Sequence, residues 1–212
     1  LDIVAACLQR LRDHPPSIWY EGEQVEDVTS HSALKRGAHT LAKLYDLRWN
    51  DPSVTLYTSP ESGRQVARSF MMPKTHEELR SISRAMKVWA DDTRGMMGRV
   101  PDYINRAMTG FAAGAGFLGE AGPRFGDNAI RYHRYLREND LCLTHTLIQP
   151  QANRAVGAAK QADEFLAARV KEETDSGIVI RGCRMLATLP ISDEIMVFPS
   201  TLLKNADEDR PY

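Results

Sequence analysis

The residues best suited to chemistry lie in the stretch 140–154, where His145 falls within an apolar run typical of a strand. A neutral imidazole donates or accepts a hydrogen bond and titrates near neutral pH, so it could take a proton from a phenol or stabilise the anion. The alternative is a hydrogen-bonded core histidine followed by a polar loop around Pro150. The donors after it that could hold a planar polar ligand are Gln149, Gln151, Asn153 and Arg154.

A second stretch, Gly98-Arg-Val-Pro-Asp-Tyr103, sets a cation and a phenol hydroxyl four residues apart. The Val100-Pro101 pair disfavours helix at Val100, so Arg99 should precede a helix and Tyr103 should lie in its first turn. Free N–H groups at a helix start favour a negative oxygen, and together these groups would suit a phenolate or a carboxylate. The alternative is a surface arginine paired with Asp102 beside a half-buried tyrosine.

Apolar spacing and capping signals predict the helices around these stretches. Thr75 and Glu78 form a capping box, in which each side chain bonds a free N–H of the other residue. The helix after Ser30 or Ser32 should bury one face made of Leu34, Ala38, Leu41 and Leu44. The predicted helices are 1–11, one from 30 or 32, 75–94, 101–118 and 125–139.

The strands are predicted from β-rich runs between turn residues, and they dominate after residue 140. Glu21-Gly22 and Thr174-Asp-Ser-Gly177 read as hairpin turns, and Ser59-Pro-Glu-Ser-Gly63 reads as a loop. We therefore expect a mainly helical domain with small hairpins over 1–139 and a mainly β domain over 140–212. The β part has too few strands for a closed barrel. The predicted strands lie within 18–25, 54–57, 65–70, 143–148, 165–173, 178–186 and 194–198.

The bulk properties exclude several classes of protein. The net charge of −1 gives no electrostatic reason to bind nucleic acid or an anionic membrane. No apolar run is long enough to cross a bilayer, and the amphipathic start does not read as a signal peptide. Cys7, Cys142 and Cys183 are odd in number and far apart, which argues against disulfides and structural zinc and favours the cytoplasm. Each is expected to be a small buried residue.

Two tempting patterns favour structural roles. Gly110, Gly114, Gly116 and Gly119 are not a dinucleotide fingerprint, because no strand leads into them, and we expect them to allow close helix packing. A basic run on the last predicted helix has acidic neighbours, and we expect it to form a solvated face. That run contains Arg131, His133, Arg134 and Arg137.

Ordered matches along nearly the whole chain resemble the 4-hydroxyphenylacetate 3-hydroxylase family, the oxygenase component of two-component, reduced-flavin-dependent phenol hydroxylases. No single match is as specific as the series. The matching segments are Asp27-Val-Thr29, Leu44-Tyr-Asp46, Gly98-Arg-Val-Pro-Asp-Tyr103, Glu138-Asn-Asp-Leu141, Thr144-His145, Pro150-Gln151, Glu172-Glu-Thr-Asp-Ser-Gly177, Arg181-Gly182, Met185-Leu-Ala-Thr188 and Phe198-Pro-Ser200.

The resemblance implies an α+β, acyl-CoA-dehydrogenase-like fold. Residues 1–139 would form the helical N-terminal domain and residues 140–212 part of the middle β-barrel, with the family's C-terminal helical bundle absent from this chain. It also implies a homo-oligomer, a dimer or a tetramer, that acts in aromatic catabolism.

The resemblance further implies that reduced FAD, delivered by a separate flavin reductase, reacts with O2 to give a flavin C4a-hydroperoxide. One oxygen atom then enters a small phenolic substrate ortho to its hydroxyl, with no metal. Arg99, Tyr103 and His145 would bind the phenol oxygen and favour its anion, because such donors lower its pKa. Ser200 and Thr201 would contact the far end of the substrate. The FAD contacts would be Gln151, Ala152, Asn153, Arg154 and Thr188.

Several alternatives accompany this interpretation. A 4-hydroxybutyryl-CoA dehydratase of the same scaffold needs cysteine ligands where Arg99 and Tyr103 stand, so we reject it. Chlorophenol hydroxylases and siderophore-chromophore hydroxylases are not separated from a 4-hydroxyphenylacetate hydroxylase by these motifs. A truncated, non-catalytic module that binds flavin or serves assembly is the alternative of a different class.

Overall fold

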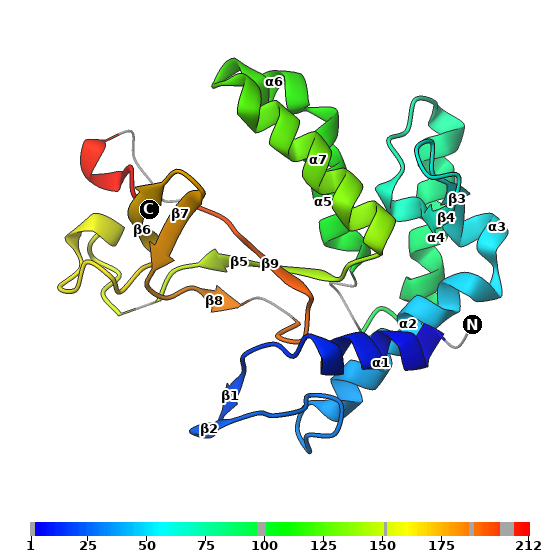
Figure 1. Cartoon of the computed structure of the whole chain (residues 1–212), viewed down its shortest axis with the longest axis horizontal. Helices are drawn as coiled ribbons and strands as arrows, with labels where there is room; N and C mark the ends of the chain where they lie inside the picture. The colour runs from blue at the N-terminus through cyan, green and yellow to red at the C-terminus, as the bar shows by residue number, and fades with distance from the viewer. Residues whose placement is uncertain (1–2, 97–100, 151, 187–188, 200–205) are drawn as a thin grey trace. The chain divides into compact units, whose positions relative to one another are not determined.

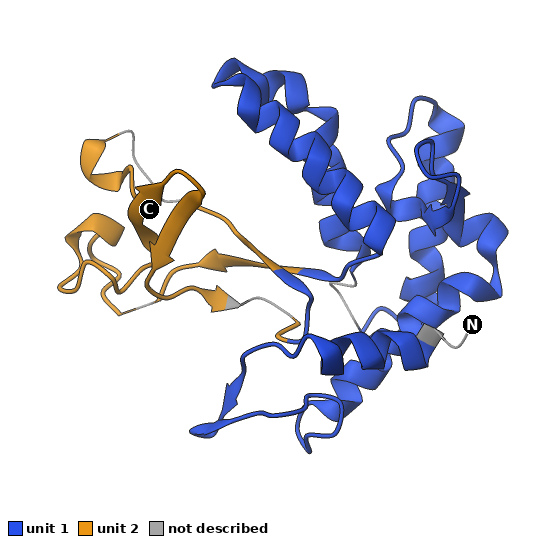
Figure 2. Ribbon diagram, in the orientation of Figure 1, with its two compact units in different colours: residues 1–143, 191–194 blue, residues 144–190, 195–212 orange. Residues whose placement is uncertain are grey.

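The computed structural model describes residues 3–96, 101–150, 152–186, 189–199 and 206–212 (Figure 1). The chain divides into two compact units (Figure 2). Unit 1 contains residues 1–143 and 191–194, and unit 2 contains residues 144–190 and 195–212. Unit 1 is mainly helical and unit 2 is mainly β, so the predicted combination of helices and sheets is confirmed.

Unit 1 contains long and short helices, together with two small hairpins. Its strands pair as β1 with β2 and β3 with β4, both antiparallel. Its strands are β1 (Trp19–Tyr20), β2 (Glu23–Gln24), β3 (Leu56–Thr58) and β4 (Gln65–Ala67). Its helices are α1 (Ile3–Asp13), α2 (Lys35–Asn50), α3 (Pro52–Thr55), η1 (Arg68–Phe70), α4 (His76–Asp92), α5 (Asp102–Ala113), α6 (Ala115–Glu120) and α7 (Pro123–Asn139).

The core of unit 1 lies between α2, α4 and the pair α5 and α7. The predicted apolar face of α2 is buried at Ala38, Leu41 and Leu44, whereas Leu34 lies just before the helix. The rings of Trp89 and Phe70 are almost completely buried with them. Removal of this apolar surface from water is the main force that holds the helices together.

Two helix boundaries differ from the prediction. Helix α2 begins at Lys35 rather than near residue 30, because the Asp27 carboxylate accepts a hydrogen bond from the Thr29 N–H at 2.7 Å and folds the next residues into turns. The helix expected over 101–118 is divided at Gly114 into α5 and α6. Glycine costs helical stability, which explains why the division occurs there.

The glycines of α5 and α6 do not all have the packing role that we expected. A Cβ added at Gly110, Gly116 or Gly119 would meet no atom within 4 Å, so these three positions do not themselves require glycine for close packing. The close approach occurs at Gly126 of α7, where an added Cβ would lie 2.4 Å from the carbonyl oxygen of Ala115 and 3.6 Å from the Cα of Gly119. Gly126 therefore lets α7 pack directly against α6.

The basic run of α7 is not a uniformly solvated face. Arg131 and Arg134 are exposed, as expected, but His133 and Arg137 are buried. The Nε2 of His133 lies 3.0 Å from the Phe70 carbonyl oxygen, and burial lowers the pKa of this imidazole. The prediction failed for these two residues because their partners are distant in the sequence.

β5 and β9 begin at the predicted residues 143 and 194, whereas β6 begins at Arg169 rather than at 165, and the strand expected over 178–186 is divided into β7 and β8. β6 and β7 form a hairpin whose turn pairs Thr174 with Gly177, as predicted, and the order β8-β5-β9 forms a second sheet. In the described part of the chain these sheets have two or three strands, so a barrel remains a prediction. The elements are β5 (Leu143–Ile148), η2 (Ala158–Lys160), β6 (Arg169–Thr174), β7 (Gly177–Arg181), β8 (Met185–Leu186), β9 (Glu194–Val197) and η3 (Asp207–Asp209).

The division between the units lies close to the expected domain boundary, but residues 140–143 and 191–194 belong with the helices. The carboxylate of Asp193 explains this, because it accepts hydrogen bonds from the Cys142 N–H at 2.7 Å and from the Arg10 guanidinium of α1 at 2.8 Å.

Cys7 and Cys142 are buried as predicted, whereas Cys183 is exposed, which corrects that expectation. Among the described residues, no helix has the length and apolar character that spanning a membrane requires.

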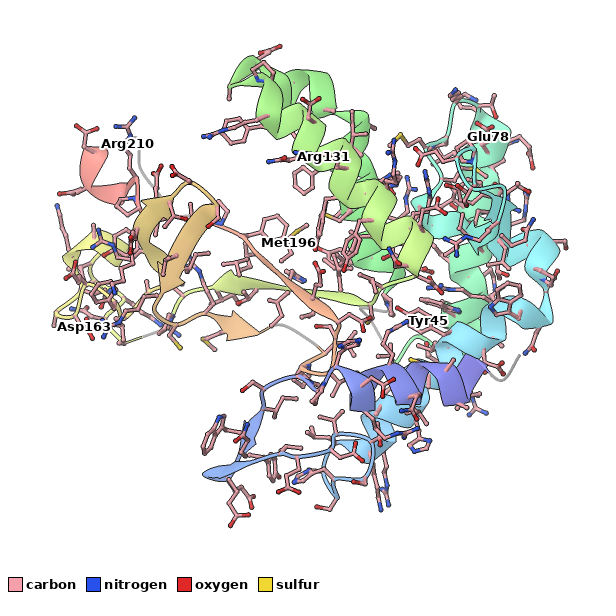
Figure 3. The ribbon with its side chains drawn as sticks, in the orientation of Figure 1. Tyr45, Glu78, Arg131, Asp163, Met196 and Arg210 are labelled. Atoms are coloured by element: carbon pink, nitrogen blue, oxygen red, sulfur yellow. The ribbon has the colours of Figure 1, made fainter. Side chains whose placement is uncertain are left out.

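The capping box at the start of α4 is confirmed. The Thr75 hydroxyl accepts a hydrogen bond from the Glu78 N–H at 3.2 Å, and the Glu78 carboxylate accepts one from the Thr75 N–H at 3.0 Å (Glu78 is labelled in Figure 3). We predict that Thr75→Ala lowers the free energy of unfolding by about 1 kcal/mol, measured by urea denaturation. Thr75→Ser keeps the acceptor and should preserve most of the stability; equal losses in both variants would contradict this role.

Glu138 links α7 to the loop 59–63. Burial raises the pKa of its carboxyl, but hydrogen bonds from Ser59, Ser62 and Arg137 outweigh this effect and lower the pKa from 4.5 to about 2. A folded-state pKa below the unfolded value stabilises the fold above pH 4.5, and this stabilisation is lost as the pH falls to about 2.

We therefore predict that Glu138→Gln lowers the free energy of unfolding at neutral pH and flattens its pH dependence over that range. Urea denaturation of both proteins at a series of pH values measures this difference. Parallel curves for the variant and the parent protein, with a constant separation down to the most acidic point, would rule out the proposed contribution.

Candidate functional site

Tyr103 lies in the first turn of α5, as predicted. It follows Asp102, the first residue of the helix, and its side chain is 45% exposed. Tyr103 therefore lies, partly exposed, at the end of the helix where the N–H groups favour negative charge. Arg99, its expected partner, lies outside the described residues.

His145 lies in the middle of β5, as predicted, and it is 3% exposed. Both neighbours, Thr144 and Thr146, are buried too, so this part of the strand is covered on both faces. The imidazole packs edge to face against the ring of Phe198, with 6.1 Å between ring centroids. A hydrogen bond of 3.0 Å from the Phe198 N–H to the Thr146 carbonyl oxygen fixes this neighbour. The imidazole is therefore buried and packed against an aromatic ring.

The residues expected to contact a flavin form an exposed turn after β5. Ala152, Asn153 and Arg154 are all exposed. The Asn153 side-chain oxygen accepts a hydrogen bond from the Ala155 N–H at 3.0 Å, and the backbone carbonyl oxygen of Asn153 accepts one from the Gln161 side chain at 2.9 Å. The turn is thus ordered by its own amide groups, while the guanidinium of Arg154 faces solvent. The other expected contact residues, Gln151, Thr188, Ser200 and Thr201, lie outside the described residues.

Tyr103 belongs to unit 1 and His145 to unit 2. The convergence of Arg99, Tyr103 and His145 on one ligand oxygen therefore remains a prediction. Each of the two described side chains nevertheless lies in the element that the sequence predicted for it, Tyr103 at a helix start and His145 within a strand.

A cavity of about 230 Å³ within unit 2 shares the Phe198 ring with His145. Its other walls include Ile178 and Ile180 of β7 and the arginines Arg169 and Arg184. One Arg184 nitrogen donates to the backbone oxygens of Ala168 and Tyr212, at 3.3 and 3.1 Å. No sequence motif marks these arginines, because they are separated along the chain from the His145 stretch.

The sequence predictions also did not include a buried arginine, Arg48, and its carboxylate partner. The Arg48 side chain of α2 is 3% exposed and forms an ion pair with Asp140, the residue that follows α7. Its guanidinium lies over the rings of Tyr45 and Trp89, with centroid distances of 4.4 and 4.5 Å (Tyr45 is labelled in Figure 3). The available signal was the spacing of Leu41, Leu44 and Arg48, which places an arginine on an apolar helix face.

Asp102 completes this group at the first position of α5. It is 5% exposed, and burial raises the pKa of its carboxyl, while the Arg48 charge and a hydrogen bond from Ser69 oppose that shift. Asn105, one turn further along α5, donates a hydrogen bond to the Ser69 hydroxyl at 3.0 Å. The helix start that carries Tyr103 is therefore held by polar contacts on its buried side.

Comparison with protein families gives a match over residues 5–212 to the model of the 4-hydroxyphenylacetate 3-hydroxylase N terminal. The oxygenase component of 4-hydroxyphenylacetate 3-monooxygenase from Thermus thermophilus is 43% identical over 204 residues, which are 96% of this chain and 42% of that protein. The pyoverdin chromophore biosynthetic protein PvcC from Pseudomonas aeruginosa is 36% identical over 85% of this chain and 35% of its own length.

Solved structures agree with the sequence relatives. The oxygenase component (HpaB) of 4-hydroxyphenylacetate 3-monooxygenase, complexed with FAD and 4-hydroxyphenylacetate, superposes with a TM-score of 0.88 at 43% identity, over 96% of this chain and 42% of that one. An archaeal 4-hydroxybutyryl-CoA dehydratase from N. maritimus, at 17% identity and a TM-score of 0.82 over 98% of this chain and 41% of that one, shares the fold alone.

The chain thus spans less than half the length of the relatives that it matches. The family model covers almost all of it, from residue 5 to residue 212. The chain belongs to the 4-hydroxyphenylacetate 3-hydroxylase family and corresponds to its N-terminal region.

Proposed function

We propose that this protein is the oxygenase component of a two-component, reduced-FAD-dependent phenol monooxygenase. The observation that carries the proposal is the similarity, over 96% of this chain, to a solved oxygenase component that contains FAD and 4-hydroxyphenylacetate. The reaction consumes a phenol, O2 and reduced FAD and yields a catechol, water and oxidised FAD. A separate flavin reductase supplies the reduced FAD, and the oxygenase works as a dimer or tetramer in the cytoplasm.

Three side chains of this chain would act on the phenol. Arg99, Tyr103 and His145 would donate hydrogen bonds to its oxygen, which lowers the pKa of the phenol and favours the phenolate. The phenolate is the better nucleophile, because its negative charge is delocalised onto the ring carbon ortho to the oxygen. The burial of His145 supports this role, since a hydrogen bond is electrostatically stronger in a low-dielectric environment.

The flavin would lie beside the turn that follows β5. When bound, reduced FAD supplies the electron pair that lets one atom of O2 pass to the ring while the other leaves as water. The turn fits such a ligand, because the Arg154 guanidinium is exposed rather than used by the core. Gln151, Ala152, Asn153 and Thr188 would complete the contacts with FAD, and Ser200 and Thr201 would contact the end of the substrate remote from the phenol oxygen.

The family relatives do not all act on the same phenol. One relative is the oxygenase component of a 4-nitrophenol 2-monooxygenase, another is the PvcC protein, and a third acts on a 3-chloro-4-hydroxyphenyl group held on a carrier protein. A chlorophenol or siderophore-chromophore hydroxylase therefore remains a second candidate, and a non-catalytic flavin-binding or assembly module is the third. Incubation of the protein with reduced FAD, O2 and a panel of phenols distinguishes these three candidates by the catechol that forms. Flavin binding without any catechol would favour the module.

We predict that His145→Ala lowers catechol formation by about 10²-fold and increases release of hydrogen peroxide. The reduced flavin still reacts with O2, but the acceptor ring is not activated. Catechol and peroxide formed per flavin oxidised measure this ratio. His133→Asn is a matched control, because it alters another buried histidine whose ring bonds Phe70 and Thr109 within unit 1. Unchanged coupling in His145→Ala would contradict the assigned role.

We also predict that Tyr103→Phe raises the pH at which bound 4-nitrophenol ionises. A hydrogen bond to a charged group contributes about 1.5–3 kcal/mol, which corresponds to a shift of roughly one to two pH units. Absorbance of the nitrophenolate, titrated with the protein in excess, reports this without turnover. A bound phenol that ionises at the same pH in Tyr103→Phe and in the parent protein would exclude Tyr103 as a donor.

A further inference from the structure

Arg48 carries a charge that the fold has enclosed almost completely. Only 3% of the residue is exposed, and the rings of Tyr45 and Trp89, each within 4.5 Å of the guanidinium carbon, cover it. A buried guanidinium gains from aromatic faces, but the loss of its hydration is large unless anions lie close to it. The arrangement therefore depends on the carboxylates around it.

Those carboxylates come from the two chain segments that lead to the proposed phenol ligands. Asp140 forms the ion pair with Arg48 and precedes His145 by five residues. Asp102 directly precedes Tyr103. Burial lowers the pKa of Arg48, but Asp140, then Tyr45 and then Asp102 oppose this, so that the pKa is raised above its ordinary value.

The chain between each carboxylate and its ligand residue is short and well held. After Asp140, the Leu141 N–H donates to the Leu136 carbonyl oxygen at 3.2 Å, and the Cys142 N–H donates to Asp193. On the other side, Arg106 of α5 donates to the carbonyl oxygen of Ser69 at 2.9 Å. A displacement of Asp102 would move Tyr103, because the two residues are adjacent in α5. A displacement of Asp140 would move the start of β5, because only two residues lie between Asp140 and that strand.

We propose that Arg48 is a positioning residue, which holds the chain before β5 through its ion pair with Asp140 and supports the start of α5 through its charge beside Asp102, and so steadies the two elements that carry His145 and Tyr103. The inference deepens the proposed function and rests on it. Arg48 itself touches neither substrate nor flavin in this role. Its charge keeps both carboxylates in place, and its planar shape fits between the rings of Tyr45 and Trp89.

The test uses variants of the gene-encoded protein and the ionisation of bound 4-nitrophenol, with catechol yield as a second measurement. Arg48→Met keeps much of the side-chain length but removes the charge. Arg48→Lys keeps the charge but not the planar group. Arg137→Met is the matched control, because Arg137 is a similarly buried arginine, 6% exposed, whose ion pairs go to Glu61 and Glu138 instead.

We expect Arg48→Met to raise the ionisation pH of bound 4-nitrophenol by roughly one unit, as the phenolate donors lose their alignment. Peroxide release should increase at the expense of catechol. Arg48→Lys should restore part of both properties. Arg137→Met should lower the melting temperature to a similar extent but leave the ionisation pH and the peroxide release unchanged. If Arg48 had a purely structural role, the two variants would behave alike.

Two outcomes would overturn the inference: a folded Arg48→Met variant with unchanged ionisation and coupling, or the same changes in Arg137→Met. If Arg48→Met does not fold, Asp140→Asn decides, because it removes the ion-pair charge at a partly exposed position without altering size. It should shift the ionisation pH in the same direction, and no shift would reject the role. A parent protein that forms no catechol and binds no phenol would instead show that the proposed function has failed.

Discussion

The helical unit depends on one buried cation more than on any other polar group. A desolvated guanidinium costs several kcal/mol unless carboxylates compensate it, and leaving it without a partner is strongly destabilising. The ion pair between Arg48 and Asp140 requires α2 and the end of α7 to keep their mutual positions, and Asp102 at the start of α5 acts on the same charge through space. The apolar core holds these helices together.

Other polar side chains of unit 1 also connect segments that are distant in the sequence. Glu138 receives hydrogen bonds from Ser59 and Ser62 of a distant loop, and His133 reaches the backbone of Phe70. Each contact joins segments separated by more than sixty residues along the chain. Polar contacts of this kind contribute modest stability but select one packing among several, so they suit a unit that must present a tyrosine at a defined helix start.

Local signals in the sequence predicted local structure well. The bounds of β5, the turns at Glu21-Gly22 and Thr174–Gly177 and the capping box at Thr75 all depend on residues within a few positions of one another. Tyr103 and His145 were placed in the correct elements for that reason. Failures occurred where a distant partner decides: the burial of His133 and Arg137, the pairing of Arg48 with Asp140, and the role of Gly126. The spacing of apolar residues does not identify a contact between distant segments. For the same reason it could not show whether the site residues lie close together.

Asp140 meets two demands at once. Its backbone is left-handed, with φ of 48° and ψ of 48°, a conformation that glycine, asparagine and aspartate adopt at the least cost. Among these three, aspartate alone brings a negative charge to Arg48. The backbone conformation at this position thus favours three amino acids, and the charge of Arg48 favours one of them. Across the family, positions 48 and 140 should change together, with a neutral residue at one accompanied by loss of the charge at the other.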